Sequence, residues 1–405
     1  MVRRLKAGAI LIVLTLLLGA GPVSARDMSW SARIRALAGS GAVMVTDEAD
    51  EPWLAHHPDT PMIPASTLKV VTAGAALATL GPDYRFATDF HLSPDGDLYV
   101  VGRGDPYLVS EELAHIAQEL KARGLRQVGR ILLDNRFFAP GLVLHGTNRS
   151  FNPYDAYNGA LCVNFNTIHA LIGADGRVAA AEPQTPLTDL ARQSAARSGL
   201  KGRVRFNLSD NPETCLVYAG DLLKAFLEQA GIRVRGPVQP TSQDPGAMPL
   251  FYRHRSRKSL AWLVSQVFKY SNNFMANQIF LTLGAEVLGP PATADKSRRV
   301  VTDYLTSHGI PAFYIEEGSG LSRRTRIKAR QMIAVLKHFK PYRELLNHQG
   351  RSLLKTGTLK DVKTMAGYLL PSNGQSWPFA ILLEGSTVGV QDRNRILSLL
   401  QKNLP

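Results

Sequence analysis

Cysteine is scarce in this 405-residue sequence, which contains Cys162 and Cys215 and no others. No C-x-x-C, no H-E-x-x-H and no other paired histidine–cysteine spacing occurs, so the sequence gives no support for a metal site or a cofactor. Two cysteines allow either one disulfide in an oxidising compartment or two buried thiols, and both remain open. Repeats of fixed period and low-complexity tracts are also missing. The composition, 45% hydrophobic and 20% charged, is that of an ordinary globular protein.

The longest apolar run lies at the N-terminus and is too short to span a membrane. "AGAILIVLTLLLGAG" has about 15 residues, against the ~20 that a spanning helix needs. It follows the basic residues Arg3, Arg4 and Lys6 and is followed by the small residues of "VSA", which end at Ala25. This three-part layout predicts a secretory signal peptide over residues 1–25, cleaved in the mature protein. We therefore expect an exported, periplasmic protein.

Acidic residues are in the minority, 33 Asp and Glu against 47 Lys and Arg, which gives a formal net charge of +14. Loss of the signal peptide removes three positive charges and leaves +11. A basic exported protein meets anionic wall polymers and lipid headgroups, so a loose association with a wall or membrane surface is one explanation of the charge. Solubility alone explains it nearly as well. Nucleic acid is not an expected partner in that compartment.

The hydrophobic pattern predicts an α/β (α+β) fold with two domains. Residues 26–84 show a short helix, two strands around an acidic turn and a long apolar helix. Residues 85–250 are β-rich with "PDGD" and "ADGR" turns, and "GRVRFNLSDNPETCLVYAG" (202–220) belongs to this β-rich texture. Residues 251–405 return to helices, two of them broken at 270–272, then strands and a final amphipathic helix. We expect the first and last segments to share one sheet flanked by helices, with 85–250 inserted.

The stretch "PMIPASTLKVVTAGAALATL" places Ser66 three residues before Lys69, at the start of an apolar helix. A buried ammonium is costly unless it is paired or loses its proton. On one helical face the Lys69 amine reaches the Ser66 hydroxyl and can act as its base, and the helix N-terminus stabilises negative charge. The spacing alone is weak, because Ser198–Lys201 and Ser352–Lys355 also match it. Neither of these heads an apolar helix.

Two further short motifs carry candidate site residues. "YSNN" contains Ser271 and Asn273, which could relay a proton and hold a substrate carbonyl, although for this motif on its own plain helix capping is the favoured interpretation. Competing matches are Ser150–Asn152 and Ser209–Asn211. The loop "GSGLS" (318–322) lies near the site or is merely a turn.

The third motif is "KTGT", on an expected edge strand. Lys355 could bind a carboxylate, Gly357 would let a peptide backbone approach, and the amide of Thr358 could form an oxyanion hole with that of Ser66. The alternative for an isolated K-T-G is a solvent-facing lysine followed by a strand glycine.

In this order S-x-x-K, S-x-N and K-T-G form a specific set, in which the motifs start at Ser66, Ser271 and Lys355. The chain resembles the low-molecular-weight penicillin-binding proteins. More narrowly it resembles the D-alanyl-D-alanine carboxypeptidase/endopeptidase family, peptidase family S13 or class C. "PASTLKVVTA", "GRGDPYL", "YSNNFMANQIF", "EEGSGLSR" and "KTGTLKDVKTMAGYL" carry the likeness over nearly the whole mature chain. Asn272 stands where the family usually has Asp, and the insert is shorter than the longest in the family.

The resemblance implies a β-lactamase/transpeptidase-like domain with a β-rich module inserted after the first motif. It implies hydrolysis of D-Ala-D-Ala ends, and of D-Ala-diaminopimelate crosslinks, in peptidoglycan stem peptides, with β-lactams as inhibitors and no cofactor or metal. The implied catalytic residues are Ser66, Lys69 and Ser271, and the implied substrate-binding residues are Asn273, Lys355, Thr356, Gly357 and Thr358. Two rivals remain: a β-lactamase or esterase, against which the insert argues, and a wall-binding protein without activity, against which the intact motif set argues.

Overall fold

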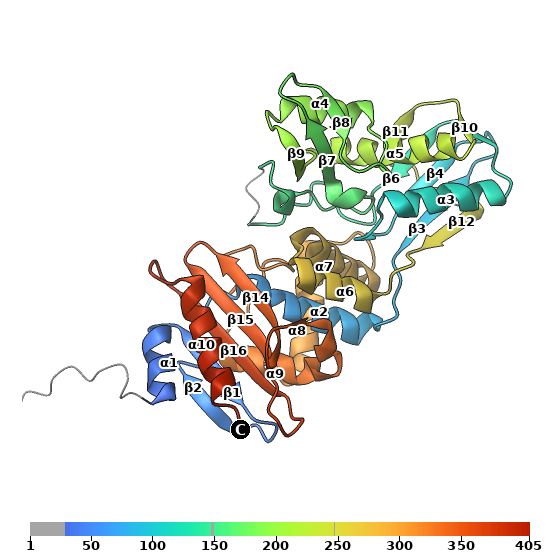
Figure 1. The fold of residues 1–405 in the computed structure, drawn as a ribbon. Coiled ribbons are helices and arrows are strands. Elements are labelled where there is room, and N and C mark those ends of the chain that lie inside the picture. The colour runs from blue at the N-terminus through green and yellow to red at the C-terminus, as the bar shows by residue number, and fades with distance from the viewer. Residues whose placement is uncertain (1–28, 147–149, 247) are drawn as a thin grey trace, which may run out of the picture.

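The structure is a computed structural model and describes residues 29–146, 150–246 and 248–405 (Figure 1). The predicted signal peptide, residues 1–25, lies outside these ranges. Within them no helix combines the length and apolar character that crossing a membrane requires.

The largest sheet takes strands from both ends of the described chain. Its strands are β1 (Ala42–Thr46), β2 (Pro52–His56), β13 (Asn347–His348), β14 (Ser352–Leu359), β15 (Val362–Leu369) and β16 (Trp377–Glu384). Their order is β13-β14-β15-β16-β1-β2, and every neighbouring pair is antiparallel. The register of Ala42 opposite Leu382 joins the beginning of the chain to its end.

Helices cover both faces of this sheet (Figure 1). They are α1 (Trp30–Ala38), α2 (Leu68–Leu80), α6 (Leu260–Tyr270), α7 (Asn273–Leu288), α8 (Ala294–Ser307), α9 (Ala329–Phe339), α10 (Val390–Lys402) and the 3-10 helix η4 (Lys340–Leu345). Successive strand residues point to opposite faces. Phe379 and Ile381 therefore join the core beneath α1 and α10, while Ala380 and Leu382 join the core around α2 and α9.

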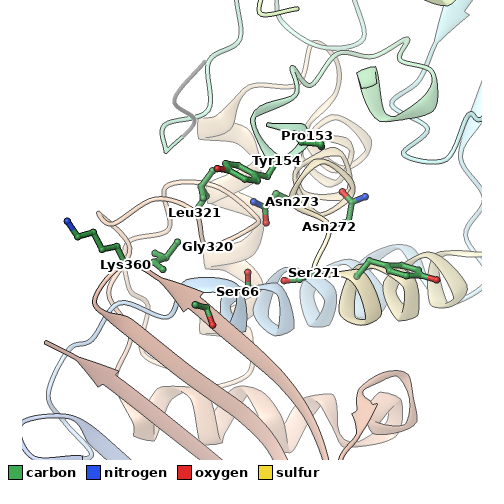
Figure 2. Close-up of a pocket in the computed structure, with 12 residues that line it drawn as sticks. Ser66, Pro153, Tyr154, Ser271, Asn272, Asn273, Gly320, Leu321 and Lys360 are labelled. Carbon is green, nitrogen blue, oxygen red and sulfur yellow. The ribbon is translucent and has the colours of Figure 1, made fainter. Parts of the chain in front are cut away.

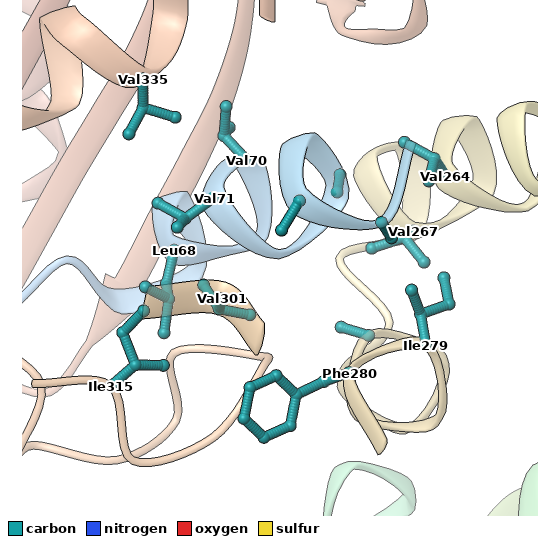
Figure 3. Packing of buried hydrophobic residues seen from close by; sticks show 14 of the residues in the cluster. Leu68, Val70, Val71, Val264, Val267, Ile279, Phe280, Val301, Ile315 and Val335 are labelled. Carbon is teal, nitrogen blue, oxygen red and sulfur yellow. The ribbon is translucent and has the colours of Figure 1, made fainter. Parts of the chain in front are cut away.

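Helix α2 is buried on all sides, and every residue from Leu68 to Leu77 is buried. Val335 of α9, Val264 of α6 and Phe280 of α7 surround it (Figure 3). A helix in this position must be largely apolar all round, which explains why Lys69 is the only charged residue between Leu68 and Leu80. Any charged side chain on it is removed from water.

The middle of the chain forms separate sheets with helices of their own. The elements are β3 (Ala87–Leu92), β4 (Leu98–Gly102), α3 (Ser110–Ala122), β5 (Gln127–Val128), β6 (Ile131–Asp134), η2 (Pro153–Asp155), η3 (Asn164–Asn166), β7 (Thr167–Ile172), β8 (Val178–Ala180), α4 (Asp189–Arg197), β9 (Gly202–Asn207), α5 (Pro212–Gln229), β10 (Arg233–Val234), β11 (Val238–Pro240) and β12 (Leu250–Arg255). A mixed sheet has the order β11-β6-β4-β3-β12, an antiparallel one has the order β8-β7-β9, and β5 pairs with β10. Residues such as Phe90, Phe206 and Leu222 build a second core here.

One expected β segment is partly wrong. Residues 202–207 form the strand β9, but from Pro212 the chain is the 18-residue helix α5. Asn211 caps this helix by accepting from the Thr214 N–H at 3.0 Å, and Pro212 occupies its first turn. Both are helix-start signals, and they override the β-like composition of "CLVY".

The expected fold class is confirmed: an antiparallel sheet flanked by helices, with β-containing elements between β2 and β13 in the chain. The predicted helix break at 270–272 is also confirmed, between α6 and α7. Cys162 and Cys215 are both buried free thiols, and burial raises the pKa of Cys162 to about 12. The division into domains at 84 and 250 stays a prediction.

Candidate active site

Ser66 lies in the 3-10 turn η1 (Ala65–Thr67), directly before α2. Two hydroxyls fix this turn by donating to the Pro64 carbonyl, Thr67 Oγ1 at 2.6 Å and Thr364 Oγ1 of β15 at 2.7 Å. Ala65 has φ +46°, a left-handed conformation that strains a residue with a side chain. The turn therefore holds Ser66 at the head of the buried helix against the sheet.

Lys69 is 1% exposed, and its Nζ has three oxygen neighbours. They are Ser66 Oγ at 2.9 Å, Asn273 Oδ1 at 2.7 Å and the Ser319 carbonyl at 2.7 Å. Burial lowers the pKa of Lys69 well below its usual value, and the charge of Lys355 lowers it further, while Glu317 opposes both. A neutral amine fits these contacts, because two N–H groups reach the two carbonyl-type oxygens and the lone pair faces the Ser66 hydroxyl.

Ser271 and Asn273 lie where α6 ends and α7 begins. Ser271 is left-handed, with φ 51° and ψ 36°, and this conformation turns the chain between the helices. Asn273 is the first residue of α7 and holds Lys69. The side chain of Asn272 accepts from the Met275 N–H at 3.0 Å and so caps α7. An aspartate performs the same capping, so the cap of α7 does not depend on this departure from the family pattern.

Lys355 lies on β14 and meets Ser271 across the pocket. Its Nζ lies 2.9 Å from Ser271 Oγ and 2.6 Å from the Thr356 carbonyl. Burial, and secondarily the positive charge of Arg393, lowers the pKa of Lys355 to about 8. Arg393 of α10 donates to the Gly357 carbonyl at 3.1 Å and supports the strand from the other side.

Strand β14 is open toward Ser66, although it is second in the sheet. The short outer strand β13 pairs only with Leu353 and Leu354, which leaves the edge free from Lys355 onward. A Cβ at Gly357 would lie 2.9 Å from the Ser66 nitrogen and 2.2 Å from Thr364 Oγ1. Only glycine permits this close approach of β14 to the helix head.

A buried carboxylate that sequence reasoning missed holds the remaining wall. Glu317, 1% exposed, accepts from the backbone N–H groups of Ser319 and Gly320, each at 2.7 Å. It thereby aims the Ser319 carbonyl at Lys69. Gly320 packs so tightly that a Cβ would lie 1.9 Å from the Ala65 carbonyl oxygen. The "GSGLS" loop, for which the sequence allowed either a place near the site or a mere turn, is therefore part of the site. The sequence signal for it was an acidic residue followed by closely spaced glycines.

These elements enclose a pocket of about 870 Å³ (Figure 2). Ser66, Ser271, Asn273 and Thr358 line it, and Tyr154 from the middle of the chain lies across from them. The side chains of Lys69 and Lys355 contact the lining serines from behind. Of the predicted residues, neither Thr356 nor Gly357 is among those that line the pocket. In the described ranges no group of three or more His, Cys, Asp and Glu side chains is arranged to hold a metal.

Two serine–lysine pairs facing one pocket, beside an antiparallel sheet and at the head of a buried helix, define the class of serine hydrolases with a penicillin-binding, transpeptidase-like fold. The chain belongs to the D-Ala-D-Ala carboxypeptidase 3 (S13) family, whose model matches residues 32–348. That match includes Ser66, Lys69, Ser271 and Asn273 and stops before the K-T-G segment.

Individual relatives extend the likeness over most of the chain. The D-alanyl-D-alanine carboxypeptidase DacB of Haemophilus influenzae is 26% identical over 396 residues, 81% of each chain. The D-alanyl-D-alanine carboxypeptidase of Actinomadura sp. (strain R39) is 29% identical over 349 residues, which is 73% of this chain but 64% of that protein. Among solved structures, penicillin binding protein 4 (dacB) of H. influenzae superposes with a TM-score of 0.77 at 22% identity, covering 92% of this chain and all of the other. The same protein was also solved with a β-lactam, at a TM-score of 0.71, 22% identity and coverage of 93% and 98%.

Proposed function

We propose that this protein is a serine D,D-peptidase that hydrolyses the D-Ala-D-Ala end of peptidoglycan stem peptides through an acyl-enzyme on Ser66. The observation that carries the proposal is the 2.9 Å contact between Lys69 Nζ and Ser66 Oγ in a desolvated setting. Membership of the S13 family and the names of the curated relatives support the choice of substrate. The same chemistry applied to a D-Ala-diaminopimelate bond would give an endopeptidase activity on crosslinks.

Acylation begins when Ser66 Oγ attacks the carbonyl carbon between the two D-alanines, while Lys69 Nζ takes the hydroxyl proton. The new oxyanion accepts from the backbone N–H groups of Ser66 and Thr358, at the helix head and the open strand edge. Asn273 Oδ1 is already occupied by Lys69, so its NH₂ donates to the carbonyl of the acyl side of the substrate.

Departure of D-alanine needs a proton on the leaving nitrogen. Ser271, held 2.9 Å from the Lys355 amine, gives its hydroxyl proton to that nitrogen as the C–N bond breaks and takes in exchange the proton that Lys69 removed from Ser66, so Lys69 is neutral again. Lys355 binds the terminal carboxylate of the substrate. Water then attacks the Ser66 ester, with Lys69 again taking a proton, and releases the shortened peptide.

A β-lactam would acylate Ser66 by the same route, because its strained amide carbonyl replaces the peptide carbonyl. The β-lactam complex of the H. influenzae protein supports this for the fold. The predicted signal peptide assigns the reaction to the periplasm, where peptidoglycan lies. The basic charge of the chain would favour loose contact with an anionic wall or membrane surface.

The direct test is release of D-alanine from a pentapeptide ending in D-Ala-D-Ala. We expect the wild type to release it, Ser66→Ala to abolish release, and Lys69→Met to lower the rate by about 1,000-fold. Ser198→Ala is the matched control, because Ser198 belongs to a second S-x-x-K sequence outside the pocket and should leave the rate unchanged. Unchanged activity in Ser66→Ala would refute the mechanism. Rapid release of hydrolysed penicillin, with no D-alanine release, would instead indicate a β-lactamase.

A further inference from the structure

A second pocket lies in the middle part of the chain, with a volume of about 370 Å³. It is formed where α4, β9 and the start of α5 meet the segment before η2. It shares no lining residue with the pocket at Ser66. The side chains that matter here are Phe151, Ser194, Arg197, Asn207, Asp210 and Thr214.

One buried polar atom of this pocket is unsatisfied. Asn207 is 3% exposed, and its Nδ2 donates to the Ser150 carbonyl at 3.0 Å. Its buried Oδ1 has no hydrogen-bond partner anywhere in the described part of the chain. Buried acceptors in this state are uncommon in native proteins, and this one is open to a hydrogen-bond donor.

Four surrounding polar side chains also lack a partner among the residues that the structure describes. Within residues 29–146, 150–246 and 248–405, no hydrogen bond or ion pair involves the side chains of Ser194, Arg197, Asp210 or Thr214. The pocket therefore offers donors, acceptors and both charge signs at once. A lone anion would suit Arg197 but would meet Asp210 and leave Asn207 Oδ1 without a donor.

An aromatic ring completes the pocket. Phe151 is 49% exposed, and its edge contact with Phe206, at 6.3 Å between ring centroids, fixes its orientation. A sugar ring matches this combination: its hydroxyls donate to carbonyl and carboxylate oxygens and accept from guanidinium and hydroxyl groups, while its C–H face packs on an aromatic ring. The volume lies near the lower end of the ~300–1,000 Å³ range of small-molecule sites.

We propose that this pocket binds an N-acetylhexosamine unit of the glycan strand to which the stem peptide is attached. The inference rests on the proposed function and adds a second contact for the same substrate. The two pockets are joined by one short segment, because Phe151 lines one and Tyr154 lines the other. Their Cα atoms lie at most ~11 Å apart, and four extended stem-peptide residues span ~14 Å. This closeness along the chain is what the proposal requires of one substrate that occupies both pockets.

Binding of tri-N-acetylchitotriose to the full chain, measured by saturation-transfer NMR and calorimetry, tests the sugar site directly. We expect saturable binding that Phe151→Ala weakens about fivefold, because the stacking face is lost. Ser194→Ala should also weaken it. Leu171→Ala is the matched control, since Leu171 is an equally exposed apolar side chain (48%) on β7 and does not line the pocket. No sugar binding, or binding of inorganic phosphate in its place, would overturn the proposal.

A kinetic comparison links the pocket to the substrate. We expect a disaccharide-pentapeptide to have a KM for D-alanine release about fivefold below that of the bare pentapeptide. Phe151→Ala should remove this difference and leave kcat and KM for the bare pentapeptide unchanged. Equal KM values in the wild type would contradict the inference while the peptidase survives. Phe151-dependent sugar binding without cleavage of either peptide would uphold the sugar pocket and defeat the proposed function.

Discussion

Two buried lysines lie within hydrogen-bonding distance of two serines, and their positive charges oppose each other. Burial lowers the pKa of both, but Lys69 is the more desolvated and also carries the repulsion of Lys355. Both effects favour the neutral amine of Lys69, which is the form that fits its contacts with the Asn273 and Ser319 oxygens. Lys355, with a pKa of about 8, is then the protonated member. The environment thus separates a base from a cationic binding group of the same residue type.

This difference predicts the alkaline side of the pH profile. kcat/KM for D-alanine release should fall above about pH 8, because Lys355 then loses the proton that attracts the substrate carboxylate. Lys355→Arg keeps its charge at all accessible pH values, so its lower kcat/KM should not decline before about pH 10. Measuring kcat/KM from pH 6 to 10.5 in both proteins checks this. An identical alkaline limb in the variant would assign the titration to another group.

The motif residues could be predicted because each keeps a fixed spacing within its own segment. Glu317 and Arg393 could not, since each acts through tertiary contacts: Glu317 aims the Ser319 carbonyl, and Arg393 holds the Gly357 carbonyl. Thr356 is the opposite case, a motif residue that the sequence predicts at the site and that the structure does not place in the pocket lining. Its neighbours are at the site, but alternation along β14 directs its side chain away from theirs.

At the scale of elements, the site depends on chain reversals that are strained. Ser271 ends α6 in the left-handed region, where glycine is the usual residue. A serine there sacrifices stability to place its hydroxyl beside Lys355. Strain of this kind is characteristic of functional positions.

Replacing Ser271 separates the loss of its hydroxyl from the relief of its left-handed backbone strain. Ser271→Ala and Ser271→Gly both remove the hydroxyl and should slow acylation by a fluorescent penicillin about 100-fold. The glycine variant should be more stable than the alanine variant by about 1 kcal/mol, because it alone relieves the left-handed strain. Stopped-flow labelling and urea unfolding measure the two quantities. An alanine variant as stable as the glycine variant would show that the turn is not strained.

The sequence predicts an element best where the pattern and its boundary signals agree. The break between α6 and α7 was predictable from the Ser-Asn-Asn sequence between two apolar helical repeats. Helix α5 is hard to predict because β-branched and aromatic residues follow its cap, Asn211-Pro212. The open edge of β14 depends on the short length of β13, which no local pattern encodes.

At the scale of the molecule, we propose that one discontinuous domain surrounds the insert, with its boundaries at 84 and, because β12 pairs within the insert's sheet, at Arg255 rather than at 250. The chain enters and leaves the insert on paired strands, with Ala87 of β3 opposite Arg255 of β12. This pairing argues for a return to the first domain immediately after Arg255. The two hydrophobic cores nevertheless interlock, because Phe138 of the insert belongs to the core around α2.

Two phenylalanines of the insert should therefore behave differently. Phe138→Ala should destabilise the core around α2 by about 3–5 kcal/mol and lower the urea midpoint at which penicillin labelling is lost. Phe206→Ala, equally buried in the second core, should lower the midpoint of that core and leave labelling in dilute urea intact. Equal loss of labelling in both variants would mean that the cores unfold as one unit.

The central claim is that Ser66 Oγ is the nucleophile that becomes acylated. Intact-mass spectrometry after treatment with penicillin G tests this claim most directly. We predict that the wild type gains the mass of one whole penicillin molecule, mapped by peptide digestion to the segment containing Ser66, and that Ser66→Ala gains none. A wild type without an adduct, or an adduct that persists in Ser66→Ala, would contradict the account.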